Sequence, residues 1–458
     1  MISAEVRLWG TRIGYVTQET TTSPAKFIYD EKFARSGIQI SPITMPLSLN
    51  EYVFPNLSER TFKGLPGLLS DSLPDKFGTT LIDEYLARQG RTSESFSSVE
   101  RLCYIGNRGM GALEFIPQIG IEPSDQSINI DELSKLADEI LSAKKRMVIT
   151  ADERAVGQLI KIGTSAGGAR AKALIAWNEE TGEIRSGQIE AGNGFGYWLL
   201  KFGTVENNKD KDTESDPVEY PKIEYAYSLM AKDAGIDMTE CRLIKSKEGV
   251  HFATKRFDRE ENSGKKIHML SLGGLAHFDF NDPGAHGYEE VISIFKKLNL
   301  SHKDTEQLFK RMIFNEVAKN YDDHVKNISF LMDRTGTWRL APAYDMTFSY
   351  NPASIWTASH QMKINGKRDN LEITDLVAAG KNMGLSDKTI ESAMQSIIAT
   401  VRKWPEYAEV VKLDEVTMNS IKMFHKYSHY YPDAFITSPM LERIKNANSP
   451  YSEVARKQ

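Results

Sequence analysis

Short runs of alternating hydrophobic and polar residues open the chain. Residues 4–9 and 13–17 alternate in this way, which predicts two strands. Glycines and prolines then punctuate residues 62–78 and indicate turns, after which an apolar stripe at helical spacing begins. We therefore expect residues 1–118 to form a small N-terminal α+β subdomain.

The middle of the chain combines strands with one helix. Apolar runs at 173–177, 197–202 and 250–257 predict buried strands. Apolar positions in 218–234 recur at helical spacing, and Gly235 follows where a left-handed C-cap is expected. A strand-rich small lobe is therefore expected at residues 150–254.

The remainder of the chain is predominantly helical. Ser386 is an expected N-cap, and apolar residues after it recur at i, i+3 and i+4 as far as Val401. This pattern predicts a helical large lobe at residues 255–446. The whole chain is then an α+β protein with two lobes and an N-terminal accessory subdomain.

Composition narrows the class of protein. A length of 458 residues exceeds what one core usually serves, so several domains are expected. The net charge of −5 disfavours a basic surface for nucleic acid along the whole chain. Cys103 and Cys241 lack CxxC spacing, which disfavours a zinc site or a disulfide framework. Without a signal-peptide layout at residues 1–7 or a long apolar run, we expect a cytoplasmic protein without a membrane span.

The strongest chemical signal is the octamer Asn-Tyr-Asp-Asp-His-Val-Lys-Asn at residues 320–327. Phosphoryl transfer needs a carboxylate that accepts the proton of the acceptor hydroxyl, and side-chain oxygens that hold Mg²⁺ against the phosphates. Protein kinases place these as an Asp followed five positions later by an Asn. Asp322 and Asn327 have this separation and Asp323 does not, so Asp322 is the expected base. A polar helix-to-strand turn would use the same residue types.

A second acidic residue is expected to return to this loop. Residues 328–332 are strand-like, 333–337 read as a turn, and 338–340 start a return strand. This hairpin would carry Asp345 back beside the loop, where it and Asn327 would hold magnesium as hard oxygen ligands. The alternative is an Asp that only caps a turn or a helix.

A stretch of small residues precedes the first strand of the small lobe. Small residues let backbone N–H groups approach phosphate oxygens closely, and basic side chains add positive charge. The residues expected to bind the ATP phosphates are Gly167, Gly168, Ala169, Arg170, Ala171 and Lys172. The stretch matches neither GxGxxG nor a Walker A sequence, and an ordinary Gly-rich turn is the alternative.

Lys201 closes the strand at 197–200, and Glu224 lies on the helix that follows. A lysine that emerges from a buried strand can pair with a phosphate and with a glutamate on a neighbouring helix. A solvated lysine at a strand end is the alternative. The order of glycine-rich loop, strand lysine, helical glutamate, catalytic loop and metal-binding Asp favours the ion pair.

Taken together, these segments resemble the HipA family of serine/threonine kinase toxins from bacterial toxin–antitoxin systems. The motifs that carry the resemblance are FKGLP at 62–66, SDSLPD at 70–75, KRFDR at 255–259, YDDHVKN at 321–327 and LAPAYD at 340–345. The resemblance extends from the N-terminus to about residue 430. It implies a two-lobed protein-kinase-like fold with an N-terminal accessory subdomain, and the use of ATP and magnesium.

The resemblance also implies roles for individual residues. It assigns Asp322 as proton acceptor and Asn327 and Asp345 as magnesium ligands. It places the adenine against a hinge at Lys255, Arg256 and Phe257. It further implies a nucleotide pocket lined by His324, Val325, Lys326, Asn327, Tyr344 and Asp345. Family members can phosphorylate a serine beside their glycine-rich loop, and Ser165 matches that position.

Partners follow from the same resemblance. A toxin of this family implies a protein substrate in tRNA charging, inhibition by a small helix-turn-helix antitoxin, and contact with DNA only through that antitoxin. The chain departs from the family in having KRF at the hinge where ERF is common, and Arg170-Ala171 where Gln-Glu is frequent. The substrate is therefore not carried over.

Two other functions stay open at this point. Phosphoinositide kinases use a similar Asp-x-His-x-x-Asn loop, although this chain has no basic amphipathic segment to face a membrane. A catalytically silent module that only binds its antitoxin is the other alternative. Every expected catalytic residue is present, which disfavours the silent module.

Overall fold

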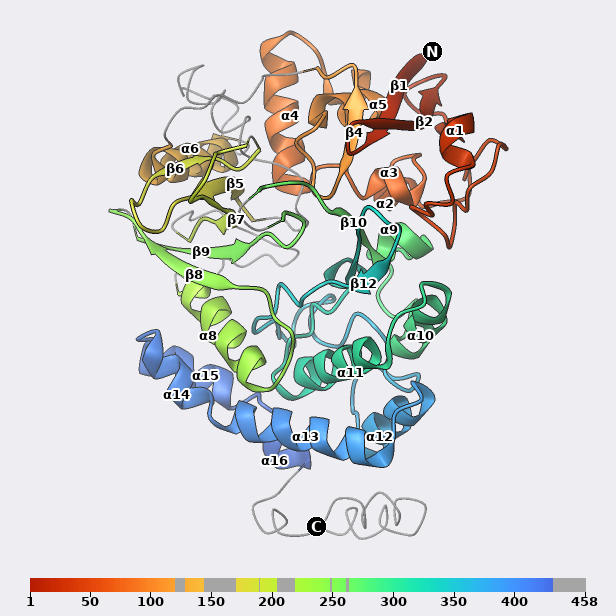
Figure 1. Cartoon of the computed structure of the whole chain (residues 1–458). Helices are drawn as coiled ribbons and strands as arrows, with labels where there is room; N and C mark the ends of the chain where they lie inside the picture. The colour runs from red at the N-terminus through yellow and green to blue at the C-terminus, as the bar shows by residue number, and fades with distance from the viewer. Residues whose placement is uncertain are drawn as a thin grey trace. The chain divides into compact units, whose positions relative to one another are not determined.

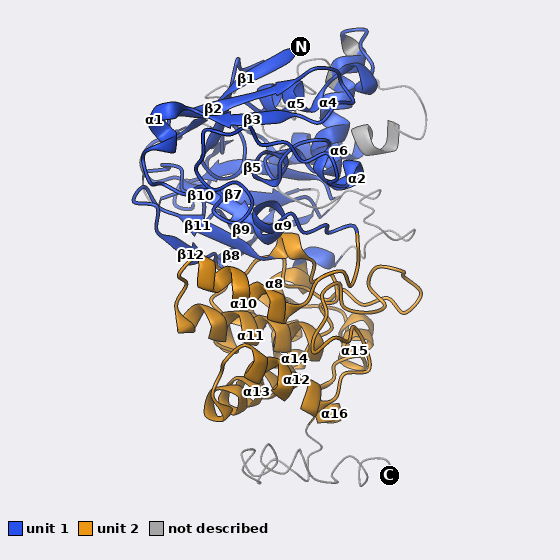
Figure 2. Ribbon diagram, turned by 90° about the vertical axis from the view of Figure 1, so that its right-hand side faces the viewer, with its two compact units in different colours: residues 1–221, 239–281, 328–341 blue, residues 222–238, 282–327, 342–458 orange. Residues whose placement is uncertain are grey.

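The computed structural model (Figure 1) describes residues 1–119, 128–143, 170–188, 190–203, 219–247, 249–260 and 263–430. Packing divides the chain into two compact units (Figure 2). Unit 1 comprises Met1–Pro221, Thr239–Asn281 and Ile328–Ala341. Unit 2 comprises Lys222–Met238, Asp282–Asn327 and Pro342–Gln458. The chain passes between the units repeatedly, so each combines segments that lie far apart in the sequence.

Unit 1 begins with a four-stranded antiparallel sheet in the order β3-β2-β1-β4. Alternation buries Val6 and Leu8 on β1, and β2 buries Ile13 and Val16, so the two predicted strands are confirmed. The strands are β1 Ile2–Leu8, β2 Thr11–Gln18, β3 Lys26–Tyr29 and β4 Leu113–Ile116. The helices of this region are α1 Glu31–Ala34, α2 Glu59–Phe62, α3 Gly67–Ser70, α4 Lys76–Arg88 and α5 Ser98–Ile105, with a 3₁₀ turn at Ser93–Ser95.

A second antiparallel sheet of unit 1 has the order β6-β5-β7-β9-β8. Its strands are β5 Lys172–Trp177, β6 Ile184–Ser186, β7 Gly196–Lys201, β8 Cys241–Lys245 and β9 Val250–Lys255, and helix α6 Ile130–Ala143 precedes it in the chain. The strands predicted from apolar runs are β5, β7 and β9. One apolar core joins this sheet to the N-terminal region, since Phe77 and Leu81 of α4 and Leu133 of α6 cluster with Trp198 and Leu200 of β7.

A buried ion pair crosses the same junction. The ammonium of Lys172, at the start of β5, lies 2.8 Å from Oδ2 of Asp75, and both side chains are only 2% exposed. Asp75 is the N-cap of α4, where its Oδ1 accepts from the N–H of Gly78 at 2.6 Å. The ion pair therefore links the helix of the N-terminal region to the start of strand β5 in the second sheet.

Removing one member of this ion pair is expected to destabilise the protein. Lys172→Met should lower the free energy of unfolding by about 3–5 kcal/mol, because the Asp75 carboxylate would stay buried without its cation. Adding Asp75→Asn, which keeps a capping oxygen but removes the charge, should recover most of that loss. Urea denaturation measures both effects. A Lys172→Met variant within about 1 kcal/mol of wild type would show that the pair contributes little.

The third sheet of unit 1, β10-β11-β12, contains the predicted hairpin. Phe330 on β11 lies opposite Leu340 on β12, and the turn between them places Gly336 at a φ of +87°. The hairpin expected before Asp345 is therefore confirmed. The elements here are β10 His268–Ser271, α9 Leu272–Ala276, β11 Ser329–Met332 and β12 Trp338–Leu340.

Unit 2 is helical, and α11 packs against α10 and α13 within it (Figure 1). Ser386 caps α13, since its hydroxyl accepts from the N–H of Thr389 at 3.2 Å, and the predicted apolar stripe is buried. Gly235 follows α8 at a φ of +79°, as predicted. The helices are α8 Tyr220–Asp233 (which begins in unit 1), α10 Tyr288–Lys297, α11 His302–Val317, α12 Ile373–Asn382, α13 Asp387–Arg402, α14 Trp404–Val410, α15 Glu415–Lys422 and α16 Tyr427–Tyr430. Over the described part of the chain, no helix has the length and apolar character to cross a bilayer.

Candidate active site

The loop with the strongest chemical signal follows α11 and belongs to unit 2. Its start is fixed by a second segment of the chain, because the N–H of Tyr321 donates to the carbonyl of Ser349 and the N–H of Ser349 donates to the carbonyl of Lys319, both at 3.0 Å. The loop ends in a 3₁₀ turn at Val325–Asn327, where the N–H of Asn327 donates to the carbonyl of His324 at 2.8 Å. The backbone of residues 319–327 is thus held at both ends.

The neighbouring carboxylates of Asp322 and Asp323 lie in different environments. The side chain of Asp322 is 23% exposed, whereas that of Asp323 is fully buried. Asp323 accepts from the hydroxyl of Tyr288 at 2.9 Å, from Nδ1 of His360 at 2.7 Å and from the N–H of Gln361 at 2.7 Å. Of the two, Asp322 is therefore the carboxylate that an acceptor hydroxyl can reach.

The amide of Asn327 has a fixed orientation. Its Nδ2 donates to the carbonyl of Asp322 at 2.8 Å. Because a backbone carbonyl can only accept, the amide nitrogen must be the atom that faces it. The Oδ1 atom on the other branch of the amide is therefore turned away from this carbonyl, where it can act as a hard oxygen ligand.

Asp345 lies on a segment that runs beside the loop. Tyr344, immediately before it, donates its hydroxyl to the carbonyl of Lys326, and Ser349 after it pairs with the start of the loop. Asp345 itself has a φ of +53°, in the left-handed region that costs free energy for a side chain other than glycine. The structure thus places the segment that contains Asp345 beside the loop at residues 319–327, and the role of Asp345 as a metal ligand stays a prediction.

The chemistry of these donors suits magnesium. Mg²⁺ prefers oxygen ligands and is usually bound through one or two carboxylates together with substrate phosphates. An amide oxygen from Asn327 and a carboxylate from Asp345 are ligands of this kind. The residues present therefore fit the metal that the sequence implies.

The predicted phosphate-binding residues belong to unit 1. Lys172 and Lys201 lie directly opposite each other on β5 and β7. Lys172 is buried against Asp75, so a phosphate contact by its ammonium would require that ion pair to open. Lys201 is partly exposed, with its ammonium 5.7 Å from the ring centre of Phe252. Lys201 is therefore the better placed of the two to meet a phosphate.

The remaining loop residues are described only in part. The guanidinium of Arg170 lies over the ring of Tyr220, 3.3 Å from its centre. Ala171 is fully buried, and its carbonyl accepts from the N–H of Phe202 at 3.1 Å. The other predicted positions, Ser165, Gly167, Gly168 and Ala169, lie outside the described residues.

Two side chains of the predicted hinge form ion pairs with other residues of this chain. Lys255 pairs with Glu240 at 3.1 Å. Arg256 makes two hydrogen bonds to the buried carboxylate of Asp258, at 2.9 and 2.8 Å, and Arg259 adds a third contact at 2.8 Å. Burial alone would raise the pKa of Asp258, but the two guanidinium groups bring it well below its ordinary value. Contacts of Lys255, Arg256 and Phe257 with an adenine ring stay a prediction.

The predicted pair of Lys201 and Glu224 is divided between the units. Glu224 lies on α8 within unit 2 and is 1% exposed, while Lys201 ends β7 in unit 1. Their contact stays a prediction.

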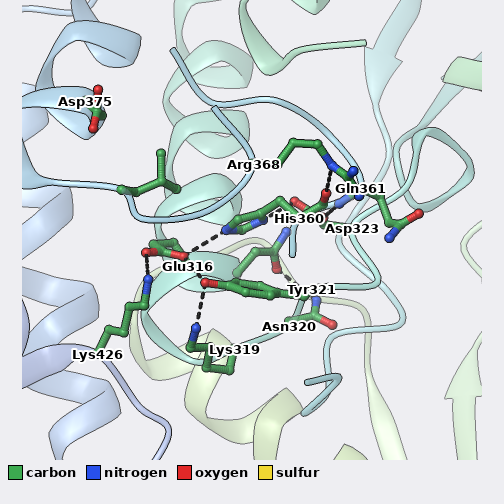
Figure 3. A network of polar contacts seen from close by, with 12 residues as sticks. Glu316, Lys319, Asn320, Tyr321, Asp323, His360, Gln361, Arg368, Asp375 and Lys426 are labelled. Atoms are coloured by element: carbon green, nitrogen blue, oxygen red, sulfur yellow. Dashed lines mark hydrogen bonds and ion pairs between the residues drawn. The ribbon is translucent and has the colours of Figure 1, made fainter. Parts of the chain in front are cut away.

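Sequence reasoning missed a group of buried charged residues behind the loop (Figure 3). Glu316 is hydrogen-bonded to both His360 and Lys426, and His360 is in turn hydrogen-bonded to Asp323. A charged residue alone gives no sign of its partner when the two lie on separate segments. One indication of this group was present in the sequence, namely Asp323, to which the five-residue spacing from Asp to Asn assigned no role.

The fold and the site define an α+β protein with a two-lobed kinase-like fold. The profile of the HipA-like C-terminal domain matches residues 164–404, and that of the HipA N-terminal domain matches residues 4–116. The chain therefore belongs to the HipA family, and the resemblance noted from its motifs is confirmed.

Comparison with a solved structure supports the same fold. The chain is similar to the HipA of Shewanella oneidensis MR-1, solved in a complex with HipB and its operator DNA. The match has a TM-score of 0.67 at 18% sequence identity and covers 97% of this chain and 99% of that one. At this identity the likeness concerns the fold.

Two curated relatives have names that propose a kinase. One from Haemophilus influenzae is 26% identical over 160 residues, which cover 31% of this chain and 46% of the relative. Another from Sinorhizobium fredii, Y4dM, is 23% identical over 176 residues, which cover 32% and 42%. The matches thus span less than half the length of either relative. Together with the family, they make this a kinase-like protein.

Proposed function

We propose that this chain is an ATP- and Mg²⁺-dependent serine/threonine protein kinase. The observation that carries the proposal is the geometry of the loop at residues 320–327. Asp322 is accessible while Asp323 is buried, the amide of Asn327 is oriented by the carbonyl of Asp322, and the Asp345 segment is bonded alongside. These are the parts that phosphoryl transfer needs, a base and a pair of metal ligands.

In the proposed reaction, Asp322 orients the acceptor hydroxyl and takes its proton. The hydroxyl oxygen forms a bond to the γ-phosphorus of ATP. At the same time, the bond breaks between that phosphorus and the oxygen that bridges the β- and γ-phosphorus atoms. ADP leaves with the electron pair of the broken bond. Asn327 and Asp345 would hold Mg²⁺, which when bound neutralises charge on the phosphate oxygens.

Other residues would bind the nucleotide. Lys201 would meet the phosphates, together with the backbone of residues 167–171, and Glu224 would orient Lys201. The hinge at residues 255–257 would hold the adenine. His324, whose Nε2 lies 4.0 Å from Oδ2 of Asp322, would line the pocket with Val325, Lys326 and Tyr344.

Membership of the HipA family supports a protein acceptor and a role as the toxin of a toxin–antitoxin pair. Within this proposal, a small helix-turn-helix protein would inhibit the kinase, and DNA would be reached through that partner. An enzyme of tRNA charging is the substrate class that the family suggests.

Incubation with γ-labelled ATP tests the class of acceptor. Purified protein would be offered Mg²⁺ with tRNA-charging enzymes in one reaction and with phosphoinositide vesicles in another. The proposal predicts label on serine or threonine of a protein and none in lipid. Label in lipid would favour the phosphoinositide-like alternative, and nucleotide binding without any transfer would favour the silent antitoxin-binding module.

Ser165 is expected to be a site of self-inactivation. A phosphoserine there would bring about −1.5 to −2 charges close to the loop proposed to bind the ATP phosphates. Repulsion should then oppose ATP binding, so the modified protein is expected to be inactive. Mass spectrometry after incubation with ATP detects the modification, and Ser165→Ala provides the unmodifiable control. A kinase that labels another protein while Ser165 stays unmodified would contradict the expectation.

A further inference from the structure

A histidine is enclosed between two carboxylates within unit 2 (Figure 3). His360 is fully buried, its Nδ1 lies 2.7 Å from Oδ2 of Asp323, and its Nε2 lies 2.9 Å from Oε2 of Glu316. An ionised carboxylate can only accept hydrogen bonds, so both ring nitrogens must donate. Only the doubly protonated imidazolium can do this, and His360 is therefore a buried cation.

The charge on His360 agrees with its surroundings. Burial by itself would lower the pKa of His360, but attraction to Asp323 and hydrogen bonds to both carboxylates raise it to about 9. Burial would likewise raise the pKa of Glu316, yet His360 and Lys426 bring it well below its ordinary value. The imidazolium of His360 and the carboxylate of Glu316 are thus both charged near neutral pH.

Glu316 connects the histidine to two helices. It lies in the last turn of α11, where its Oε2 also accepts from the hydroxyl of Tyr321 at 2.6 Å. Its Oε1 accepts from the ammonium of Lys426 at 2.7 Å and from the hydroxyl of Tyr430 on α16. Glu316 is therefore a fixed point, held by four donors from three segments of the chain.

Asp323 connects the histidine to the catalytic loop. Its remaining contacts come from Tyr288 on α10 and from the backbone of Gln361, so its carboxylate cannot move without breaking several hydrogen bonds. The far side of His360 is also held, because its carbonyl accepts from Nε of Arg368 at 2.6 Å. Asp323 directly follows Asp322, so this anchorage fixes the backbone from which Asp322 projects.

We infer that His360 is a positioning residue for phosphoryl transfer, which locks Asp323 to Glu316 and so holds the backbone of Asp322 where its carboxylate meets the acceptor hydroxyl. The inference rests on the proposed function, since the step it serves is the proton transfer to Asp322. A displacement of about 1 Å in a reacting group can cost about 100-fold in rate. Loss of the imidazolium should therefore act on turnover more than on ATP binding.

The direction of the pH dependence follows from the raised pKa. The stabilisation that the His360 charge provides is complete below its ordinary pKa of 6.5 and is lost as the pH rises through about 9. Lys319 acts in the opposite sense, because burial and the nearby Lys426 lower its pKa to about 7. Comparison of variants that all retain Lys319 isolates His360. The charged and titratable groups around His360 are Asp323, Glu316, Tyr288, Tyr321, Lys319, Lys426, Tyr430 and Arg368.

His360→Gln tests the inference, because a glutamine carries no charge and cannot donate to both carboxylates. The control is His268→Gln, which removes another fully buried imidazole, one that donates to the carbonyl of Ile40 at 3.2 Å in unit 1. His360→Gln is expected to lower kcat by about 10–100-fold with the KM for ATP within about threefold. Hydrogen exchange of amides 319–327 should become about tenfold faster. His268→Gln should change neither kcat nor this exchange.

The exchange measurement separates the inference from the proposed function. If wild type transfers no phosphate but His360→Gln still loosens residues 319–327, the proposed function fails and the anchorage stands. Wild-type kcat and exchange in a folded His360→Gln protein would overturn the inference. A fall in kcat without faster exchange would also overturn it, because His360 would then act directly.

A second variant covers the case in which His360→Gln does not fold. Glu316→Gln keeps the pair of His360 and Asp323 but removes one carboxylate, which should lower the pKa of His360. The pH at which residues 319–327 lose protection against exchange should therefore fall from near 9 by about one unit. If residues 319–327 of Glu316→Gln lose their protection against exchange at the same pH as in wild type, the inference is contradicted.

Discussion

Replacing Asp322 with Asn is expected to lower phosphoryl transfer by about 10²–10⁴-fold, the usual contribution of a general base. Asparagine has nearly the same shape but cannot take the proton of the acceptor hydroxyl. Since the Asp322 side chain is partly exposed, the fold and the affinity for ATP should stay close to wild type. Single-turnover transfer, with thermal unfolding and ATP titration on the same preparation, measures all three.

Asp323→Asn is the matched control for this variant. It changes the adjacent carboxylate in the same way, but that carboxylate is buried against His360. Breaking a buried ion pair should lower the free energy of unfolding by about 3–5 kcal/mol. Near-wild-type turnover in Asp322→Asn would end its assignment as the base and leave Asp323 as the candidate.

Replacing Asp345 with Ala is expected to weaken nucleotide binding chiefly when magnesium is present. Loss of a carboxylate ligand should reduce metal affinity by about 10–100-fold or more. ATP binding should therefore weaken strongly in Mg²⁺ and change little in a chelator. Calorimetric titration under both conditions checks the difference.

The left-handed backbone at Asp345 supplies a control for stability. Alanine at a φ of +53° should cost about 1–2 kcal/mol more than aspartate, whereas asparagine tolerates this conformation. Asp345→Asn should therefore weaken metal-dependent binding, because its amide oxygen carries no charge, while keeping more stability than Asp345→Ala. Equal loss of ATP affinity with and without magnesium would mean that Asp345 has a structural role.

Local patterns predicted much of the fold. Strands β5, β7 and β9, the helix α13 with its Ser386 cap and the hairpin before Asp345 all depend on residues close together in the sequence. The strands β6 and β8 were not predicted, because runs of three and five residues give too few alternations to distinguish them from loops.

The features that could not be predicted from the sequence depend on contacts between segments far apart in the chain. Lys172 follows a glycine-rich stretch, which favours a phosphate ligand, but its ammonium is buried against Asp75 of a helix much earlier in the chain. His360 carries no local sign of a function, and its role becomes visible only when Asp323 and Glu316 meet around it. The five-residue spacing favoured Asp322 over Asp323. The structure agrees with this choice, because the carboxylate of Asp323 is already bound by Tyr288, His360 and the backbone of Gln361.

The central claim is that this chain itself moves the γ-phosphoryl group of ATP to a hydroxyl of a protein. The most direct test measures ADP and phosphorylated protein in the same quenched samples, with purified wild type and Asp322→Asn. The account predicts equal molar amounts of the two products with wild type, both dependent on Mg²⁺, and almost none with Asp322→Asn. ADP accompanied only by inorganic phosphate, or equal labelling by wild type and Asp322→Asn, would contradict it.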